Sequence, residues 1–571
     1  MKSLASQVVS TSIAPGDGAS ESPPSVEQNI GFACSDLPHR QGAGVAMRWL
    51  ASGGARVEIS YRQLAEESSR FANVLLALGV VPGDACFMVL PKIPEVFYAF
   101  LGTLKARAIA CPLFVHFGEP ALQDRLADAE ARVLVTRQAL LKKVARIRAN
   151  LPNLRHVLVI DIEQDIDDAT LSLPRLMRTA APEFEVAPTS VETPSLLHYT
   201  SGSTGKPKGV QLTHGALAFQ RQTTQETLGV RPGDVFWCTA DPGWVTGTSY
   251  GIVGPWSLGV TQVHYNGGFD ADTWMAILEQ EGVNVWYTAP TALRMLMREE
   301  AGLFRNRRID RLRHICSVGE PLNPEIVHWG RQVLGKEIHD TWFQTETGAI
   351  MIANRPGVPI RPGSMGKPVS GVEVAILDRC GRPLGPGHQG RLCLRARWSS
   401  MFRQYLHRPD AYAGKFHDGF YDSGDTAVCD QDGYYWFIGR ADDVINTTGH
   451  LVGPFEIESA LLEIPEVVES AAIGAPDPIR FEKVVVFVVV RAGVTQSREL
   501  ESRIRLHLAN RVSSFAAPQD VVFVDEIPKN NSGKIMRRLL RARFLGQDAG
   551  DVSTLEARFA SGKESTAAEE G

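Results

Sequence analysis

Apolar residues follow two different periods along the first half of the chain. Residues 56–60 alternate as in a strand, and the next segment places Leu64, Phe71 and Val74 at helical spacing before Gly79. Further patterns predict a helix over 95–108 and buried strands at 84–92, 131–136, 156–162, 282–290 and 314–320. Since strand–helix–strand order favours right-handed crossovers, this part predicts an α/β fold with doubly wound parallel sheets.

The pattern changes twice further along. Residues 362–438 are rich in Gly, Pro and short alternating strands, which predicts a small β-barrel-like subdomain. After Arg440 the order becomes helix, strand, strand, helix, which predicts a compact, mobile α+β domain. Ser, Pro, Gly and Glu dominate both ends, so tails are expected there. The predicted organisation is a tail over 1–28, a large domain over 29–440, a small domain over 441–550 and a tail over 551–571.

Composition and charge narrow the classes of partner. The chain has 571 residues and a formal net charge of -5, which argues against a mainly electrostatic nucleic-acid binder. The eight cysteines show no metal-ligand spacing. The first thirty residues lack the apolar core of an export signal, and no stretch approaches the roughly 18 apolar residues of a membrane span. We therefore expect a cytoplasmic protein without a membrane partner.

A glycine- and hydroxyl-rich segment follows the apolar residues before position 199. Its sequence is Tyr-Thr-Ser-Gly-Ser-Thr-Gly-Lys-Pro-Lys-Gly, over 199–209. Glycines let a backbone approach a ligand closely, and hydroxyls, free N–H groups and lysines together favour a phosphate. The segment lacks the spacing of a Walker loop, and a flexible surface linker would not need its two lysines. It predicts a polyphosphate site.

Further motifs follow in a fixed order, at 317–321 (SVGEP), 340–348 (DTWFQTETG), 421–425 (YDSGD), 439–443 (GRADD) and 528–534 (PKNNSGK). Together with the phosphate segment, they resemble the adenylate-forming superfamily of acyl-CoA synthetases, luciferases and peptide-synthetase adenylation domains. Residues 240–256 and 287–294 are similar to the AMP-forming acetyl-CoA synthetase branch. The resemblance covers about residues 30–550. It implies that the large domain is an adenylation domain and that ATP, Mg²⁺ and coenzyme A are used.

The resemblance also assigns roles to residues of this chain. Thr345 would contact the α-phosphate, Glu346 would hold Mg²⁺, and Lys534 would bridge the acyl carboxylate and the α-phosphate. Asp442 would be the hinge of the small domain. Nucleotide and coenzyme A contacts are implied for Thr200, Ser201, Gly202, Ser203, Thr204, Gly205, Lys206, Lys208, Gly319, Glu320, Pro321, Asp340, Thr341, Trp342, Phe343, Gln344, Asp425, Arg440, Thr448 and Gly449.

Two of these motifs have ordinary structural interpretations when taken alone. Residues 423–425 (SGD) are expected to form a tight turn that presents Asp425 to the ribose. Residues 534–538 (KIMRR) alone would more often be the solvated start of a basic helix. It is the joint order of the motifs that favours a catalytic interpretation.

Five residues are implied to line the pocket for the acid, namely Trp244, Val245, Thr246, Val318 and Phe343. The branch has a second tryptophan where this chain has Phe343, which should lengthen the pocket modestly. One methylene is discriminated by only about 1–3 kcal/mol in an apolar pocket, so a C2–C4 preference is predicted. Simple core packing is the alternative role of Phe343. Lys142, Lys143 and Arg511 are weaker candidates for coenzyme A contacts, because exposed basic residues are common.

A second departure lies after the hinge. The family usually has an arginine where this chain has Leu451, so slow adenylation is predicted. Alternatives to a short-chain acyl-CoA synthetase are a medium-chain or aromatic acyl-CoA synthetase, an adenylating enzyme with another thiol acceptor, and a catalytically weak acyl-nucleotide sensor. Because adenylation would need the charge of Lys534, reversible acetylation by a lysine acetyltransferase and a deacetylase is a regulatory hypothesis.

Overall fold

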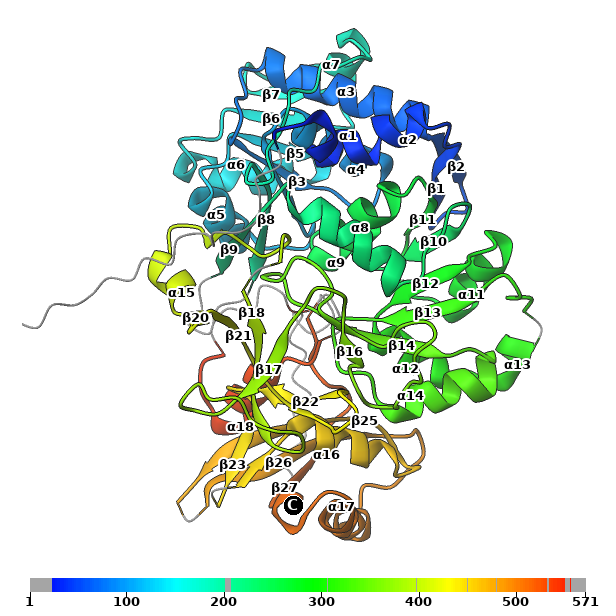
Figure 1. Ribbon diagram of the computed structural model, residues 1–571, viewed down its shortest axis with the longest axis vertical. Helices are drawn as coiled ribbons and strands as arrows, with labels where there is room; N and C mark the ends of the chain where they lie inside the picture. The colour runs from blue at the N-terminus through cyan, green and yellow to red at the C-terminus, as the bar shows by residue number, and fades with distance from the viewer. Residues whose placement is uncertain are drawn as a thin grey trace, which may run out of the picture.

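The computed structural model describes residues 23–549 and 555, apart from 201–206, 306, 397, 449, 479 and 531–533. In these parts of the chain the strands form four sheets (Figure 1). The first sheet has the order β16 (Lys367–Pro368), β15 (Ile352–Ala353), β14 (Ile338–Trp342), β13 (His314–Ser317), β12 (Val285–Thr288), β10 (Val235–Cys238), β11 (Thr261–Asn266), β1 (Val45–Ala51) and β2 (Arg56–Ser60).

The second sheet is formed mainly by the segment between β2 and β10. Its order is β19 (Gln404–Tyr405), β9 (Lys208–Thr213), β8 (Pro194–Thr200), β4 (Ile109–Leu113), β3 (Ala85–Val89), β5 (Val133–Thr136), β6 (His156–Val159) and β7 (Thr170–Ser172). Strands from β14 to β1 in the first sheet, and from β8 to β7 in the second, pair in parallel. The predicted parallel sheets are therefore confirmed, and antiparallel strands close both edges of the first sheet and one edge of the second.

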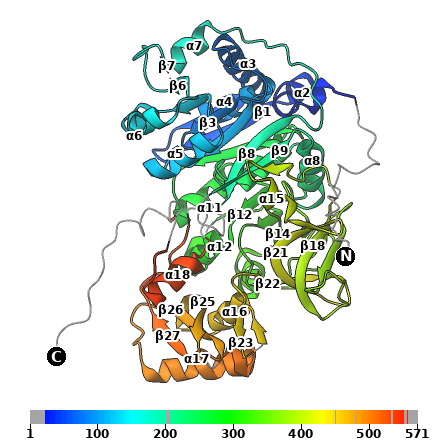
Figure 2. The ribbon, with the colours of Figure 1, turned by 90° about the vertical axis from the view of Figure 1, so that its left-hand side faces the viewer.

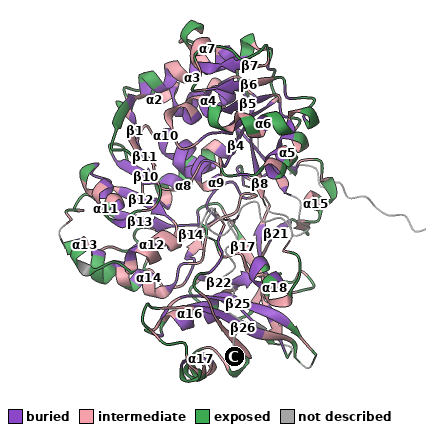
Figure 3. Ribbon diagram, turned by 180° about the vertical axis from the view of Figure 1, so that it is seen from behind, coloured by how far each residue is buried: buried purple, intermediate pink, exposed green. Residues whose placement is uncertain are grey.

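Helices cover both faces of these sheets. Residues of α3 (Tyr61–Ala77), α4 (Pro94–Lys105) and α8 (Ala216–Glu226) share one hydrophobic core with strands of both sheets. The outer face of the second sheet packs on α5 (Glu119–Asp128) and α6 (Leu141–Ile147). The outer face of the first packs on α11 (Ala271–Gln280), α12 (Pro290–Met297) and α14 (Pro324–Trp329). Both sheets are accordingly buried in their middle strands and exposed on their outer helices (Figure 3).

The third sheet is the small β subdomain and is antiparallel. It contains β17 (Val374–Leu377), β18 (Gln389–Arg395), β21 (Phe420–Cys429), β20 (Phe416–His417) and β22 (Tyr435–Arg440). The expected turn at 423–425 is wrong, because these residues lie inside β21. They form a bulge: Arg391 pairs with Thr426 and Cys393 with Asp422, so β21 carries extra residues between the two pairs. Gly424, at φ +74°, permits this backbone.

The fourth sheet forms the C-terminal domain, which lies below the rest of the molecule in Figures 1 and 2. It contains β24 (His450–Val452), β23 (Ile445–Thr447), β26 (Phe481–Val490), β25 (Val467–Asp477) and β27 (Asp520–Phe523). One face packs on α16 (Pro454–Leu462) and α17 (Arg498–Arg511), and the other on α18 (Arg537–Leu545). We call residues up to Arg440 the body. No helix in the described parts of the chain combines the length and hydrophobicity that crossing a membrane requires.

Candidate active site at the junction of body and C-terminal domain

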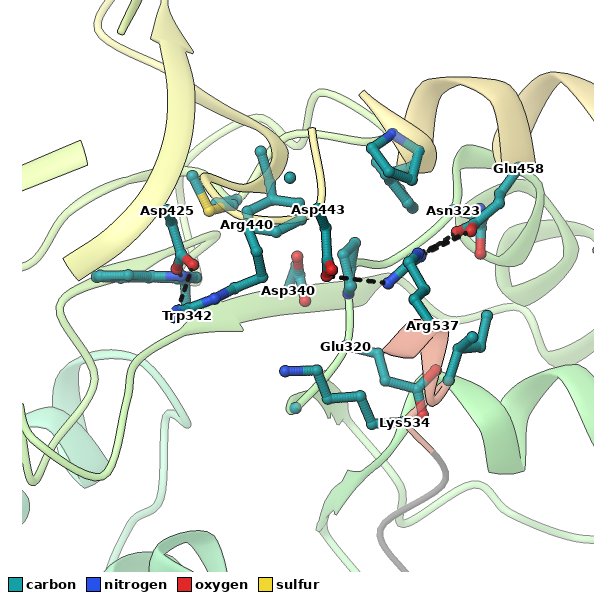
Figure 4. Close-up of a pocket in the computed structure, with 18 of the residues that line it drawn as sticks. Glu320, Asn323, Asp340, Trp342, Asp425, Arg440, Asp443, Glu458, Lys534 and Arg537 are labelled. Carbon is teal, nitrogen blue, oxygen red and sulfur yellow. Dashed lines mark hydrogen bonds and ion pairs between the residues drawn. The ribbon is translucent and has the colours of Figure 1, made fainter. Parts of the chain in front are cut away.

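A cavity of about 180 Å³ lies between the body and the C-terminal domain (Figure 4). The body lines it with the ends of β13 and β14 and with β21 and β22, and the C-terminal domain lines it with α16, β25 and the start of α18. Residues of five predicted motifs meet in its wall: Gly319, Glu320, Pro321, Asp340, Thr341, Trp342, Phe343, Gln344, Asp425, Arg440 and Lys534.

Asp425 is the centre of the body wall. It is only 3% exposed, and it accepts hydrogen bonds from Trp342 Nε1 at 3.0 Å and from Gln344 Nε2 at 3.1 Å. Arg440 Nη1 pairs with its other oxygen at 2.8 Å. Burial raises the pKa of Asp425, and the charges of Arg440 and Lys534 oppose the rise. The strand pairing accounts for this arrangement, because Asp425 and Arg440 are register partners on β21 and β22.

The carboxylate of Asp340 is in the opposite situation. It is 5% exposed, and its Oδ1 has no hydrogen-bond partner in the protein. Burial holds the pKa of Asp340 well above its usual range. Its neighbour Glu320 is satisfied, by Thr291 Oγ1 at 2.6 Å and by Arg294. The wall therefore presents one buried acceptor that only a bound molecule or water could satisfy.

Lys534 enters the cavity from the C-terminal domain. Its backbone is held by Asn530, whose Oδ1 accepts from Lys534 N at 2.9 Å and whose N donates to Lys534 O at 2.9 Å. Its ammonium points toward Arg440 and Asp425 (Figure 4). The side chain is exposed in the cavity, and desolvation by the surrounding walls together with the charge of Arg440 lowers its pKa.

Glu346 lies near the end of the phosphate segment rather than in the cavity wall. Tyr405 on β19 donates a hydrogen bond from its hydroxyl to Glu346 Oε1 at 2.8 Å. The ammonium of Lys208 lies 5.3 Å from the centre of the same tyrosine ring. Thr345, next to Glu346, is partly exposed. Tyr405 thus brings the predicted metal ligand and one predicted phosphate lysine close together.

The structure describes only the two ends of the remaining phosphate segment. Thr200 ends β8 and pairs with Lys208 on β9, so the two ends of the segment lie side by side. The predicted residues Ser201, Gly202, Ser203, Thr204, Gly205 and Lys206 lie outside the described residues.

Only Phe343 of the five acid-pocket residues lines the cavity. Val245 and Val318 are 7% exposed and belong to the core between the two large sheets. Phe343 packs on that core, with its ring edge-to-face on Tyr250 at 5.4 Å. Trp244 instead contacts Phe114 at 4.8 Å in the outer core of the second sheet, and Thr246 is partly exposed.

The predicted hinge and acceptor residues lie outside the cavity wall. Asp442 is exposed and lies 3.7 Å from Arg440 Nε. Thr448 follows β23 with φ +55°, and its N donates to Arg480 O at 2.8 Å. Gly449 lies outside the described residues, and Leu451 pairs through its backbone with Asn446.

Two of the weaker coenzyme A candidates already have protein partners. Lys143 Nζ donates to Phe117 O at 2.6 Å, and Arg511 Nε donates to Glu463 Oε1 at 2.8 Å. Lys142 is exposed on α6. The roles of all three in coenzyme A binding stay predictions.

Several cavity residues had not been predicted, among them Arg294, Asn323, Asp443, Glu458, Glu469 and Arg537. Arg537 would be exposed if residues 534–538 were only the solvated start of a basic helix, yet it is only 17% exposed in its side chain and pairs with Glu458. No periodicity along α18 signals this, because the burial arises where the helix start meets α16. Arg294 lies within the motif at 287–294, so this motif could have identified it as a cavity residue.

Comparison with known families decides what kind of protein this site belongs to. Residues 38–406 match the model of the AMP-binding enzyme family, and residues 456–534 match that of the AMP-binding enzyme C-terminal domain. The chain belongs to the AMP-binding enzymes. This confirms the resemblance to adenylate-forming enzymes, and the two matched segments fall on either side of the cavity.

Curated relatives of this AMP-binding enzyme extend over most of its length. An acetyl-coenzyme A synthetase of Bacillus subtilis is 45% identical over 87% of this chain and 87% of its own. One of Pyrobaculum aerophilum is 38% identical over 88% and 79% of the two chains. An acetyl-coenzyme A synthetase 2 of Pseudomonas aeruginosa is 36% identical over 92% and 86%.

Solved structures agree with the fold. An acyl-CoA synthetase of Brucella canis is 35% identical, with a TM-score of 0.71 over 91% of this chain and 94% of its own. An anthranilate CoA ligase in complex with anthranoyl-AMP is 30% identical, with a TM-score of 0.82 over 90% and 96%. The predicted fold class, a large α/β part followed by a smaller C-terminal domain, is confirmed.

Proposed function

We propose that this AMP-binding enzyme joins a short-chain carboxylic acid, acetate or another C2–C4 acid, to coenzyme A at the expense of ATP. The observation that carries the proposal is the cavity itself. One wall offers a buried, arginine-paired carboxylate, and the other offers a lysine ammonium that points toward it. This arrangement suits a nucleotide whose α-phosphate becomes more negative during the reaction.

The polar groups of the body wall fit ATP. Asp340 Oδ1 is a buried acceptor without a donor, and an amino group such as the exocyclic amine of adenine would satisfy it. Asp425 can accept from the two neighbouring hydroxyls of a ribose, and Arg440 lies beside it. Gly319, at φ +92°, and Pro321 give the strip between them an open face for a flat base.

Glu346 is the residue that would hold Mg²⁺. Among the described residues, no group of three or more His, Cys, Asp or Glu side chains converges as a metal site. A magnesium ion bound with a nucleotide needs only one or two carboxylates, because phosphate oxygens and water supply its other ligands, so the donor set fits. When bound, the ion would neutralise charge on the phosphates.

The proposed chemistry has two steps. In the first, a carboxylate oxygen attacks the α-phosphorus of ATP, the bond to the bridging oxygen breaks and pyrophosphate leaves. Lys534 would hold the incoming carboxylate and stabilise the negative charge on the non-bridging oxygens of the α-phosphate in the transition state. In the second step, the thiol sulfur of coenzyme A attacks the acyl carbon, AMP leaves with the bond electrons, and the thiol proton passes to solvent.

The second step would require the C-terminal domain to turn at Asp442. Lys534 occupies the cavity in the present orientation, whereas Thr448 lies outside its lining. A turn would withdraw the lysine and bring the hairpin of β23 and β24 toward the thiol. Asp442 is exposed in the short connection between β22 and β23.

The size of the acid rests on Phe343. It lines the cavity with its ring packed on Tyr250, and the curated relatives quoted above are acetyl-coenzyme A synthetases. A phenylalanine in place of the larger indole favours acids slightly longer than acetate as additional substrates. A cytoplasmic location and acetylation of Lys534 remain proposals as well. The latter predicts that a protein acetylated at Lys534 loses adenylation, and full adenylation would contradict it.

The deciding experiment measures AMP and thioester formation with acetate, propionate, butyrate, hexanoate and benzoate, for the wild type and Lys534→Ala. We expect turnover on the C2–C4 acids and a loss of about 10³-fold in the adenylation step of the variant. Activity on hexanoate or benzoate alone would contradict the pocket size. Transfer to another thiol but not to coenzyme A would contradict the acceptor. ATP binding without turnover on any acid would favour a nucleotide sensor.

A further inference from the structure

An ion pair in the C-terminal domain holds the start of α18, immediately after Lys534. Arg537 is the first residue of that helix, and its Nη2 donates to both oxygens of Glu458 on α16, at 2.7 and 2.6 Å. Arg537 Nε donates to the same carboxylate at 3.2 Å. The two side chains are 17% and 8% exposed, so little water competes for the pair. Such a forked contact fixes direction as well as distance.

Glu458 is itself fixed to its domain. Its Oε1 also accepts from Ala472 N on β25 at 2.9 Å. On the other side of the lysine, Lys529 Nζ pairs with Glu469 of β25 at 2.5 Å. The segment that carries Lys534 is therefore anchored before and after the lysine, by two carboxylates that line the cavity (Figure 4).

The same part of the C-terminal domain contacts the body. Asn323 Nδ2 donates to Ser459 Oγ at 2.9 Å, and Arg298 Nη2 donates to Val468 O at 3.3 Å. Arg298 also lies 3.7 Å from Glu469. Arg537 Nη1 lies 4.0 Å from Asp443, next to the proposed hinge. The anchor of the lysine is thus continuous with the surface that sets the orientation of the domain.

We propose that Arg537 and Glu458 are positioning residues for the adenylation step, which hold the Lys534 ammonium over the reacting phosphate. This rests on the function proposed above. Neither residue needs to touch a substrate: the pair fixes the helix start, and the helix start fixes the lysine. Displacement of a catalytic group by about 1 Å can cost about 10²-fold in rate, so the pair is important to the first step. In the second step Lys534 would be withdrawn from the cavity, so this step should not depend on the pair.

The test compares the two half-reactions in the full chain. Adenylation is followed by acetate-dependent exchange of pyrophosphate into ATP, and thioester formation is followed with synthetic acetyl-adenylate and coenzyme A. We expect Arg537→Gln and Glu458→Gln to lower exchange by about 10²-fold. With supplied acetyl-adenylate both should stay within about twofold of the wild type. Arg537→Lys keeps the charge and should recover part of the exchange.

Arg541→Gln is the matched control. Arg541 lies one turn further along α18 and pairs with Glu482 at 3.1 Å, away from the cavity lining. We expect both half-reactions of this variant to match the wild type. Since removal of one partner leaves a buried charge, the double variant Arg537→Gln with Glu458→Gln is included and its folding is checked by thermal unfolding. It should be more stable than either single variant and still deficient in exchange.

Three results would overturn the inference: wild-type exchange in the double variant, equal losses in both half-reactions of a folded variant, or the same exchange defect in Arg541→Gln. A different failure belongs to the proposed function. If the wild type shows no pyrophosphate exchange with any of the acids, the adenylation proposal is wrong, and this inference is wrong as well.

Discussion

The two walls of the cavity treat their charged groups differently. On the body wall, Asp425 already accepts hydrogen bonds from Trp342, Gln344 and Arg440 without a ligand. On the opposite wall, the ammonium of Lys534 has no hydrogen-bond or ion-pair partner among the described residues. The difference is informative, because a group that recognises a constant part of a substrate is best held rigidly. A group that stabilises charge formed during the reaction is best left without a competing partner.

The largest effect on ATP binding should come from dismantling the rigid wall. Asp425→Ala removes the acceptor of three donors and leaves the charge of Arg440 without its buried partner. We expect the dissociation constant for ATP, measured by calorimetry, to rise by about 10²-fold, since hydrogen bonds to charged groups contribute about 1.5–3 kcal/mol each. Asp432→Ala is the control, because this exposed carboxylate pairs with Arg361 and neither residue lines the cavity. Equal weakening in both variants would contradict a ribose role for Asp425.

A smaller effect, on the preference among acids, is expected from changing Phe343, which lines the cavity beside that wall. Phe343→Trp enlarges the ring that packs on Tyr250 and shortens the space for the acid. The ratio of kcat/KM for acetate to that for propionate should rise about tenfold, as one methylene is worth about 1–3 kcal/mol. An unchanged ratio would mean that Phe343 serves only in packing.

A modest increase in the adenylation rate is expected when a positive charge is added to the hairpin of β23 and β24. Leu451→Arg introduces the arginine that the resemblance to adenylate-forming enzymes implies after the hinge, and a charge-assisted contact to a phosphate would raise the adenylation rate by up to about tenfold. Pyrophosphate release in single-turnover experiments measures this step. A rate equal to that of the wild type would show that the missing arginine does not slow adenylation.

The smallest effect should be a shift in the pH at which the adenylation rate falls. The role proposed for Lys534 in adenylation requires its protonated form. Because burial together with Arg440 lowers its pKa, the rate should fall with rising pH earlier than an ordinary lysine would require. Asp425 acts on the other side: burial raises its pKa, and the rate should fall as acid protonates it. Lys534→Arg keeps its charge at high pH and should lose the alkaline limb. If that limb persists in the variant, it belongs to another group.

The sequence predicts the body wall better than the wall that faces it. Strand periodicity identified β13, and the motif at its end meets the motif on β14 because parallel strands end at one edge of a sheet. Arg537 and Glu458 were not predicted, since their burial depends on how two distant helices meet. The bulge at 423–425 was mistaken for a turn because Ser, Gly and Asp suit both, and only strand pairing distinguishes them.

Arg440 is the last residue of β22, and the proposed hinge residue follows almost at once. This closeness sets where the chain could be cut or fused. A fragment that ends at Asp442 would keep the arginine that holds Asp425, whereas one that ends at Gly439 would lose it although it is barely shorter. An engineer who wished to exchange C-terminal domains between such enzymes would therefore place the junction after the arginine, so that the nucleotide side keeps its ion pair.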